Sequence, residues 1–423
     1  MTDRSNVAVM GERAARAAKA LRNASSQQKD NALRAMAAAL LDHSKSILDA
    51  NAADVEAAKL AGATDAVLDR LRLDEKRLEG VSKGITTVVG LPDPVGVVHE
   101  GRTLPNGLVL QRVAVPFGVI AAIYENRPNV TADIACLCFK AGSATILRGG
   151  REALRSNIAI GTAISHALKT TGFSEDAVQV VTTEDRQIVT DLLNAREYID
   201  LVIPRGGESL IKLVCDNAKM PVLAGGAGVC HVYVDRSADL ESAINVVVNA
   251  KTRRFSTCNA LDTLVVHAGI APALLPGLAQ ALAEKKTVMK CDAQAYAIVA
   301  KQPNAEQSVD SDFGHEWLSP VLSVKTVATA DEGIEFIQEH SSGHSDCIMS
   351  NDLALAMRFT REIDTAVCYV NASTQFTDGG QFGMGAEIID STQKFHARGP
   401  VGLQEICTYR WIVFGNGQIR SAT

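Results

Sequence analysis

The chain has 423 residues, and its 42 Lys and Arg against 48 Asp and Glu give a formal net charge of −6. This acidic balance excludes a typical nucleic-acid binder, which carries a basic excess, and 47% hydrophobic residues exclude a disordered chain. The longest apolar stretch, Val113 to Tyr124, is far shorter than the roughly 20 residues of a membrane span. We therefore expect a globular protein of two or three domains without a nucleic-acid or membrane partner.

The N-terminal segment has no apolar run that ends in a cleavage site, so it does not look like a secretory signal. The nine cysteines are odd in number and include no CxxC pair. This pattern argues against a disulfide framework and against a structural zinc site, and it favours a reducing compartment. We predict a cytoplasmic protein without a bound metal.

The first ninety or so residues are rich in Ala and Leu at helical spacing, and Ser25 with Gln28 forms a candidate capping box. The stretch Gly90–Pro94 breaks this helical region. Pro105-Asn106-Gly107 then lies between two strand-like runs and predicts a hairpin, because Asn-Gly suits the positive φ angles of a tight turn. The sequence alone fits an oligomerisation element and a plain surface hairpin equally well.

From Val115 the pattern changes to short apolar strands that alternate with helices. Strands this apolar are buried on both faces, as in a parallel sheet covered by helices. The pattern predicts a doubly wound α/β nucleotide-binding architecture. The expected strands are 119–123, 144–147, 178–181, 200–203 and 222–223, and the expected helices are 130–140, 152–169, 185–195 and 208–217. A second alternating block runs from about 232 to 370, with expected strands at 261–266, 321–327 and 368–370.

Two strand-to-helix junctions can hold a dinucleotide, although the chain has no GxGxxG fingerprint and no P-loop. In one, Arg205, Gly206 and Gly207 precede a helix whose free N–H groups attract anions. In the other, Arg148 and Arg151 flank a Gly-Gly pair. Arg at this point suits a 2′-phosphate, so the pair favours NADP over NAD. Solvated turn residues are the alternative interpretation of both junctions.

Cys258 differs from the cysteines in apolar elements because it follows the polar, cationic segment 251–257. Nearby positive charge favours the thiolate, which is the form that attacks carbonyl carbon. An ordinary buried thiol is the alternative. His340 and His344 have i, i+4 spacing, but the Ser-Ser-Gly between them is a poor helix, so we interpret them as loop residues rather than metal ligands.

Several motifs are distinctive in combination and together span most of the chain. They are 115–120, 124–131, 147–150, 203–207, 249–252, 256–259, 369–374, 376–383, 391–394 and 396–400. They resemble the γ-glutamyl phosphate reductases, a branch of the aldehyde dehydrogenase superfamily. The resemblance implies reduction of L-glutamyl 5-phosphate by NADPH to L-glutamate 5-semialdehyde and phosphate, the second step of proline biosynthesis.

The same resemblance implies an aldehyde-dehydrogenase-like fold with three parts. We expect an NADP-binding domain at 1–99 and 114–248 and an α/β catalytic domain at 249–385. A small β oligomerisation element is expected from 100–113 with 403–423, so a homo-oligomer is anticipated. The resemblance also implies a partnership with glutamate 5-kinase, because L-glutamyl 5-phosphate cyclises readily.

The resemblance makes Cys258 the nucleophile, with its backbone N–H and the Asn129 side chain as donors to the oxyanion. Glu316 matches a Glu-x-x-x-Pro segment that holds the nicotinamide ribose, although Ser319 replaces the more usual Gly. The cationic side chains that are candidates for gripping the phosphate or α-carboxylate of the substrate are Arg127, Lys251 and Arg398. Structural ion pairs are the alternative for all three.

One absence separates this chain from hydrolytic aldehyde dehydrogenases, in which a Glu before a Gly-Gly pair activates water. The matching stretch here, Leu223-Ala224-Gly225-Gly226, has no carboxylate. A thioester on Cys258 would then survive for exchange with hydride or phosphate. This favours an acyl-phosphate reductase over a hydrolytic aldehyde dehydrogenase. A coenzyme A-acylating relative is a second alternative, distinguished by whether phosphate or coenzyme A supports aldehyde oxidation. A catalytically silent homologue is a further alternative, disfavoured by the intact Cys258 motif.

Overall fold

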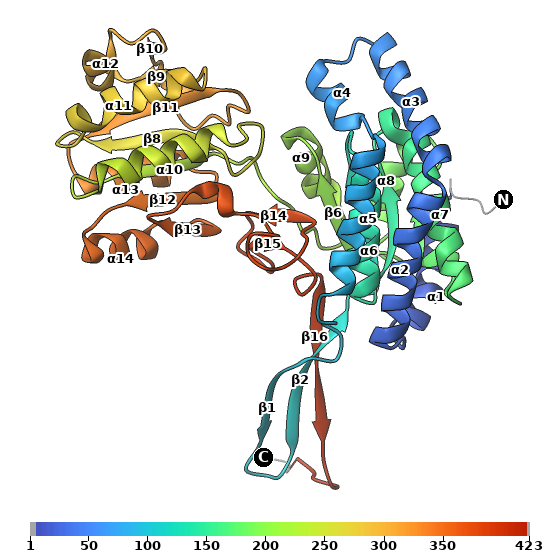
Figure 1. Ribbon diagram of the computed structural model, residues 1–423. Coiled ribbons are helices and arrows are strands. Elements are labelled where there is room, and N and C mark those ends of the chain that lie inside the picture. The colour runs from blue at the N-terminus through green and yellow to red at the C-terminus, as the bar shows by residue number, and fades with distance from the viewer. Residues whose placement is uncertain (1–5, 421–423) are drawn as a thin grey trace. The chain divides into compact units, whose positions relative to one another are not determined.

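The computed structural model describes residues 6–420 and separates into two compact units (Figure 1). Unit 1 comprises residues 6–224, 383–389 and 401–420, and unit 2 comprises residues 225–382 and 390–400. The division falls after residue 224 rather than after the predicted 248, because strand β7 (Cys230–Val234) pairs with β8 and β12 of unit 2. Unit 2 also contains residues 390–400, which lie beyond the expected catalytic domain.

Unit 1 is built on a parallel sheet in the order β5-β4-β3-β6. Every residue of β3 is buried, which explains its continuous apolar sequence. The strands are β3 (Val119–Tyr124), β4 (Ala144–Arg148), β5 (Val178–Val180) and β6 (Leu201–Arg205). The expected strand at 222–223 is reduced to a single bridge between Val222 and Val202.

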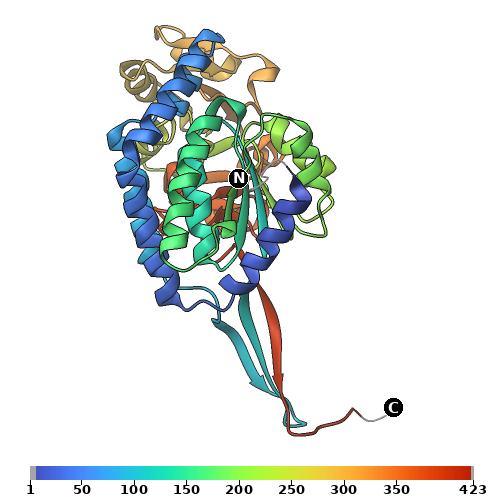
Figure 2. The same cartoon turned by 90° about the vertical axis from the view of Figure 1, so that its right-hand side faces the viewer.

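Helices cover both faces of this sheet (Figure 2). The helices of unit 1 are α1 (Val7–Leu21), α2 (Ser26–Asp42), α3 (Ser44–Leu60), α4 (Asp65–Leu71), α5 (Glu75–Val89), α6 (Asn129–Lys140), α7 (Leu154–Thr170), α8 (Gln187–Asn194) and α9 (Glu208–Asn217). Of these, α1, α6, α7 and α9 pack on the strands, and α2, α3 and α5 pack on α6 and α7. The capping box at the start of α2 is confirmed: Ser25 Oγ accepts from the Gln28 N–H at 3.2 Å, and the Ser25 N–H donates to Gln28 Oε1 at 2.8 Å. The doubly wound architecture is also confirmed.

An antiparallel three-stranded sheet extends from the helical part of unit 1 (Figure 2). It consists of β1 (Val98–Thr103), β2 (Val109–Pro116) and β16 (Cys407–Phe414). The predicted hairpin joins β1 to β2, with Gly107 at a φ of +84°. Strand β16 pairs with β2 along its whole length. The sheet leaves several large apolar side chains of β16 exposed, namely Tyr409, Trp411, Val413 and Phe414.

Unit 2 contains a parallel seven-stranded sheet in the order β10-β9-β11-β8-β7-β12-β13. The strands after β7 are β8 (Leu261–His267), β9 (Val288–Cys291), β10 (Ala305–Gln307), β11 (Val321–Val327), β12 (Ser345–Met349) and β13 (Val367–Val370). The helices are α10 (Leu240–Thr252), α11 (Ala271–Glu284), α12 (Ala293–Val299), α13 (Ala330–His340) and α14 (Leu353–Glu362). Separate apolar cores form beneath α10 and α11 and beneath α13 and α14.

A short two-stranded sheet, β14 (Ile389–Ser391) with β15 (Gly399–Val401), lies near the end of the chain. Of the helices within residues 6–420, none is long and apolar enough to cross a membrane. All nine cysteines are free thiols.

Candidate active site

Cys258 lies half-buried in the loop between α10 and β8. A later segment of unit 2 fixes this loop through the residue that follows Cys258. Thr374 Oγ1 donates to the carbonyl oxygen of Asn259 at 2.7 Å, and the Asn259 side-chain amide donates to the carbonyl oxygen of Thr377 at 2.9 Å. The thiol is therefore carried on an ordered loop rather than on a free turn.

The backbone of Cys258 is also held from its carbonyl side. A Cβ atom at Gly228 would lie 1.9 Å from the carbonyl oxygen of Cys258, so only glycine fits this approach. The Cys230 thiol donates to the same oxygen at 3.2 Å. The N–H of Gly228 donates to Glu316 Oε1 at 3.1 Å, so the residue that packs against the Cys258 carbonyl group also holds Glu316.

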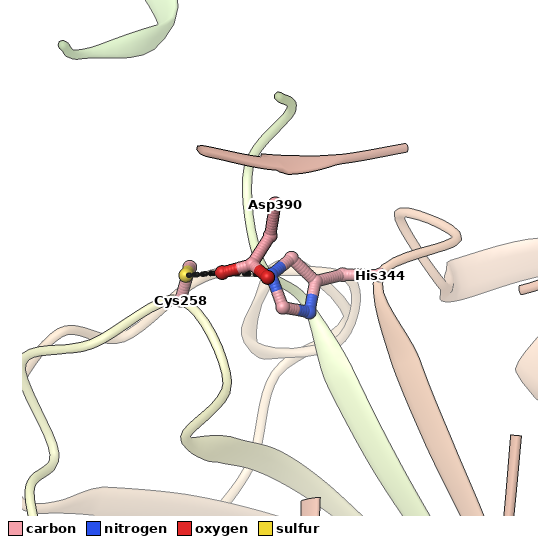
Figure 3. A group of neighbouring side chains, drawn as sticks. All are labelled: Cys258, His344 and Asp390. Atoms are coloured by element: carbon pink, nitrogen blue, oxygen red, sulfur yellow. Dashed lines mark hydrogen bonds and ion pairs between the residues drawn. The ribbon is translucent and has the colours of Figure 1, made fainter. Parts of the chain in front are cut away.

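Two further side chains approach the thiol of Cys258 (Figure 3). Cys258 Sγ donates to Asp390 Oδ2 over 3.7 Å, and His344 Nε2 lies 3.9 Å from the same oxygen. The side chains of His344 and Asp390 are only 1% and 9% exposed, so bulk water screens this group weakly. The sequence placed Cys258 in a cationic segment, whereas the structure puts a carboxylate against its sulfur.

The surroundings of His344 determine its charge. Its Nδ1 lies 2.9 Å from Ser345 Oγ and 3.9 Å from Cys230 Sγ. Burial lowers the pKa of His344 to about 4, with a smaller opposing contribution from Asp346. The ring is therefore neutral near pH 7, and it does not form an imidazolium–thiolate pair with Cys258.

Cys, His and Asp are also residue types that bind zinc, and the ligand atoms of these three lie within 4.8 Å of one another. No fourth His, Cys, Asp or Glu joins the group among residues 6–420. The resemblance makes Cys258 the reacting thiol. We therefore interpret the group as the surroundings of a nucleophile rather than as a metal site.

Lys251, a sequence candidate for substrate binding, lies fully buried in α10. Its Nζ is 3.5 Å from Asp262 Oδ1, and burial raises the pKa of Asp262 to about 6 while the nearby Lys251 partly opposes that rise. Asp262 Oδ1 also accepts from the Trp317 N–H at 3.0 Å, directly after Glu316. This geometry matches the structural ion pair that the sequence left open, with Asp262 anchoring the Glu316 segment.

Arg398 is partly buried and also engaged by an acid. Its Nη1 donates to Asp364 Oδ1 at 2.8 Å, and its Nη2 donates to the carbonyl oxygen of Asp364 at 3.1 Å. Lys394 pairs with the same carboxylate. These bonds to Lys394 and Arg398 hold the pKa of Asp364 below its usual value. The Nε of Arg398 is buried without a hydrogen-bond acceptor within residues 6–420.

The remaining catalytic and substrate candidates lie in unit 1, around the start of α6. Arg127 is partly buried in the loop between β3 and α6. Asn129 is the first residue of α6, and its side-chain amide donates to Asp133 Oδ2 at 2.8 Å. Burial raises the pKa of Asp133. The amide of Asn129 thus has a fixed orientation within its own unit.

The Arg148 and Arg151 junction follows β4, as the sequence predicts. Arg148 is half-buried, and its Nε has no hydrogen-bond acceptor within the described part of the chain. Burial lowers the pKa of this guanidinium. Arg151 is exposed and pairs with Glu152 at 3.2 Å. Arg148 therefore keeps an unused donor that an anion could accept, while Arg151 already has a carboxylate partner.

The glycine junction precedes α9, again as the sequence predicts, and follows Arg205 at the end of β6. The N–H of Gly207 donates to Glu125 Oε2 at 2.9 Å, and a Cβ at Gly206 would lie 2.6 Å from that oxygen. The two glycines therefore accommodate a carboxylate of the chain itself. Glu125 therefore already accepts from the Gly207 N–H, at the junction where the sequence predicts a cofactor phosphate.

Sequence reasoning missed Asp390 altogether and considered His344 only as a loop residue. Asp390 is separated from Cys258 by more than a hundred residues and belongs to a short strand with no periodic pattern. Its position directly before the motif Ser391-Thr392-Gln393-Lys394 was the one available signal. Both residues are distant from Cys258 in the sequence and reach its thiol only through the tertiary fold, so no local pattern predicts them.

A sequence model of the aldehyde dehydrogenase family matches residues 1–307 and 306–412. The chain is 48% identical over 417 residues to the γ-glutamyl phosphate reductase of Chloroflexus aggregans, covering 97% of this chain and 99% of that one. The crystal structure of γ-glutamyl phosphate reductase from Thermotoga maritima matches with a TM-score of 0.94 and 44% identity, covering 97% and 99% of the two chains. An acetylating aldehyde dehydrogenase from Geobacillus thermoglucosidasius has the same fold, with a TM-score of 0.69 at 18% identity and coverage of 98% and 97%.

Proposed function

Because the chain belongs to the γ-glutamyl phosphate reductase branch of the aldehyde dehydrogenase family, we propose that it reduces L-glutamyl 5-phosphate with NADPH through a thioester on Cys258. The products are L-glutamate 5-semialdehyde and phosphate, and the reaction is the second step of proline biosynthesis. The observation that carries the role of Cys258 is its half-buried thiol, held on an ordered loop with a carboxylate 3.7 Å away.

In the proposed reaction the sulfur of Cys258 attacks the acyl carbon, phosphate leaves and a thioester forms. The oxyanion formed during attack needs fixed donors, which we assign to the Cys258 backbone N–H and the Asn129 side chain. Removing one such donor typically lowers kcat by roughly 100- to 1,000-fold. The bond from Thr374 to the Asn259 carbonyl and the close packing of Gly228 against the Cys258 carbonyl support a loop whose backbone is held before substrate arrives.

A bound nicotinamide cofactor supplies the hydride that reduces the thioester to the aldehyde. Arg148 fits such a group, because its buried Nε lacks an acceptor. We assign Arg148 to the 2′-phosphate of NADP and keep Arg151 and Arg205 as secondary candidates. Glu316 stays the proposed contact for the nicotinamide ribose, with one oxygen already held by the Gly228 N–H. Gly206 and Gly207 stay predictions for the cofactor phosphates beside Glu125.

The substrate carries a phosphate and an α-carboxylate, and both groups suit arginine. We propose Arg127 and Arg398 for these contacts, and the unused Nε of Arg398 supports its assignment. The buried pair with Asp262 makes Lys251 the weakest of the three substrate candidates. Its proposed role is to pair with Asp262, which in turn holds the backbone next to Glu316.

The exposed apolar residues of β16 support the predicted homo-oligomer, since a sheet with this surface gains stability when a second copy covers it. Nine reduced cysteines support a reducing compartment, and we propose the cytoplasm. The partnership with glutamate 5-kinase stays a prediction of the family resemblance.

The role of Cys258 is tested by incubating the protein with L-glutamate 5-semialdehyde and NADP in the absence of phosphate. We expect one equivalent of NADPH per active site and a glutamyl adduct on Cys258, detected by peptide mass spectrometry. Cys230→Ser is the matched control, because Cys230 is buried and its pKa is raised well above the usual value. An adduct on another cysteine, or none, would contradict the proposal.

A further inference from the structure

Asp390 and His344 border the reacting sulfur but have no part in the reaction described so far. In that reaction no residue has yet been assigned to move the proton of the thiol. An acyl phosphate carries two negative charges near neutral pH, and a phosphate trianion is a poor leaving group. The Cys258 thiol loses a proton when its sulfur attacks. A group that takes the thiol proton and delivers it to the leaving phosphate would assist both events.

We propose that Asp390 carries this proton. Its carboxylate accepts the proton of Cys258 as the sulfur–carbon bond forms, and it gives the proton to the bridging oxygen as the carbon–oxygen bond breaks. Hydrogen phosphate leaves and Asp390 returns to the carboxylate form, so no other reactant is consumed in this step. The thiolate released with the aldehyde later regains a proton from water. This inference rests on the proposed function.

The geometry of unit 2 supports this role because one glycine segment packs against the backbones of both residues. A Cβ at Gly225 would lie 2.6 Å from the carbonyl oxygen of Asp390, and a Cβ at Gly228 would lie 1.9 Å from that of Cys258. The two backbones are thus packed against the same short stretch. Sulfur and carboxylate oxygen are held 3.7 Å apart, within reach of direct proton transfer through an S–H···O bond.

His344 is assigned as a positioning residue. The neutral ring is a poor proton acceptor near pH 7, since burial lowers its pKa to about 4. Its Nε2 is 3.9 Å from Asp390 Oδ2, which is packing distance rather than a hydrogen bond. The buried ring instead lies beside the carboxylate, and Ser345 Oγ orients it from the other nitrogen, Nδ1, at 2.9 Å.

The other ionisable groups around this pair do not compete for the proton. Burial raises the pKa of Cys230 on β7 well above its usual value and that of Tyr369 on β13 to about 12, so both stay protonated at neutral pH. Asp346 on β12 is already paired with His231 at 3.0 Å. Among the contacts described for residues 6–420, the carboxylate oxygen that accepts from the Cys258 thiol is Asp390 Oδ2.

The test uses the reverse reaction of the full-length enzyme, which separates two steps. Semialdehyde and NADP without phosphate give the NADPH burst that accompanies thioester formation. Added phosphate then resolves the thioester and sets the steady state, in which Asp390 would take the proton of the attacking phosphate. In Asp390→Asn we expect the burst to persist while phosphate-dependent turnover falls by about 100-fold or more. Asp331→Asn on the exposed face of α13 is the control and should match wild type.

A second readout does not depend on any substrate. Asp390→Asn removes a negative charge beside the sulfur, so the thiol pKa should fall and alkylation of Cys258 by iodoacetamide at neutral pH should become faster. Faster alkylation with slower phosphate-dependent turnover is a combination that a merely disturbed loop would not produce. Asp390→Glu should recover part of the turnover, because it restores a carboxylate.

Three results would overturn the inference. The first is wild-type phosphate-dependent turnover in Asp390→Asn. The second is a parallel loss of the burst, the turnover and the alkylation rate, which would indicate a structural role. The third appears in the wild-type enzyme itself: steady turnover without phosphate would refute the proposed function and with it the phosphate step. This third failure is distinguishable because it is seen before any variant is made.

Discussion

Gly228→Ala tests whether the position of the Cys258 loop controls catalysis. The new Cβ would lie 1.9 Å from the Cys258 carbonyl oxygen and 2.5 Å from its carbonyl carbon. Both contacts are to backbone, so the loop must move by about 1 Å, a misplacement that can lower the rate by about 100-fold. Overpacking of this kind also costs about 1–3 kcal/mol of stability. We expect a kcat near one hundredth of wild type in a folded protein.

The assay is NADP reduction on L-glutamate 5-semialdehyde with phosphate, combined with urea unfolding. Gly277→Ala in α11 is the matched control, since its Cβ would meet only the flexible tip of Ile244 at 3.3 Å. Alanine in place of a helical glycine stabilises by roughly 0.5–1 kcal/mol, so this control should keep full activity. Wild-type kcat in Gly228→Ala would refute the claim that this contact fixes the nucleophile.

Three further predictions concern stability and assembly. Burial lowers the pKa of His344 to about 4, so between that pH and about 6.5 the unfolded state binds more protons and the free energy of unfolding falls as the pH drops. In urea unfolding this loss of stability with falling pH should be smaller in His344→Gln, and the same pH dependence in the variant would contradict the reasoning. Lys251→Met leaves Asp262 buried without its ion-pair partner and should cost about 3–5 kcal/mol, largely recovered when Asp262→Leu is added; a single variant as stable as wild type would count against the pair. Trp411→Asp should lower the molecular mass measured by sedimentation equilibrium, and an unchanged mass would remove β16 as the oligomer contact.

The sequence predicts those elements of the fold that a short run of residues defines by itself. The buried strand β3 is a continuous apolar run, and Asn106-Gly107 gives the turn between β1 and β2. Strand β12 is not among the strands expected from the sequence, and it begins with two polar residues, Ser345 and Asp346. In the structure buried Asp346 bonds to His231 of β7 and to Ser341, the residue after α13. Both partners are brought to it by the fold, so no local pattern predicts its burial.

In the candidate site, too, some residues could be predicted from their neighbours in the sequence and others could not. Cys258 stands out by its polar neighbourhood, and Glu316 by its motif. Lys251 belongs to the same cationic stretch as Cys258, yet helix α10 turns it into the core against Asp262. Asp390 reaches the sulfur from a distant strand. Charge along the sequence therefore singled out Cys258, the proposed nucleophile, but did not identify the groups that surround it.

The dependence of the reverse reaction on phosphate tests the central claim most directly. The measurement is NADP reduction on L-glutamate 5-semialdehyde, with and without inorganic phosphate, in the wild type and in Cys258→Ala. The account predicts sustained turnover only with phosphate, a single burst without it, and neither in Cys258→Ala. Equal steady rates with and without phosphate would mean that water resolves the thioester, and the enzyme would then be a hydrolytic aldehyde dehydrogenase.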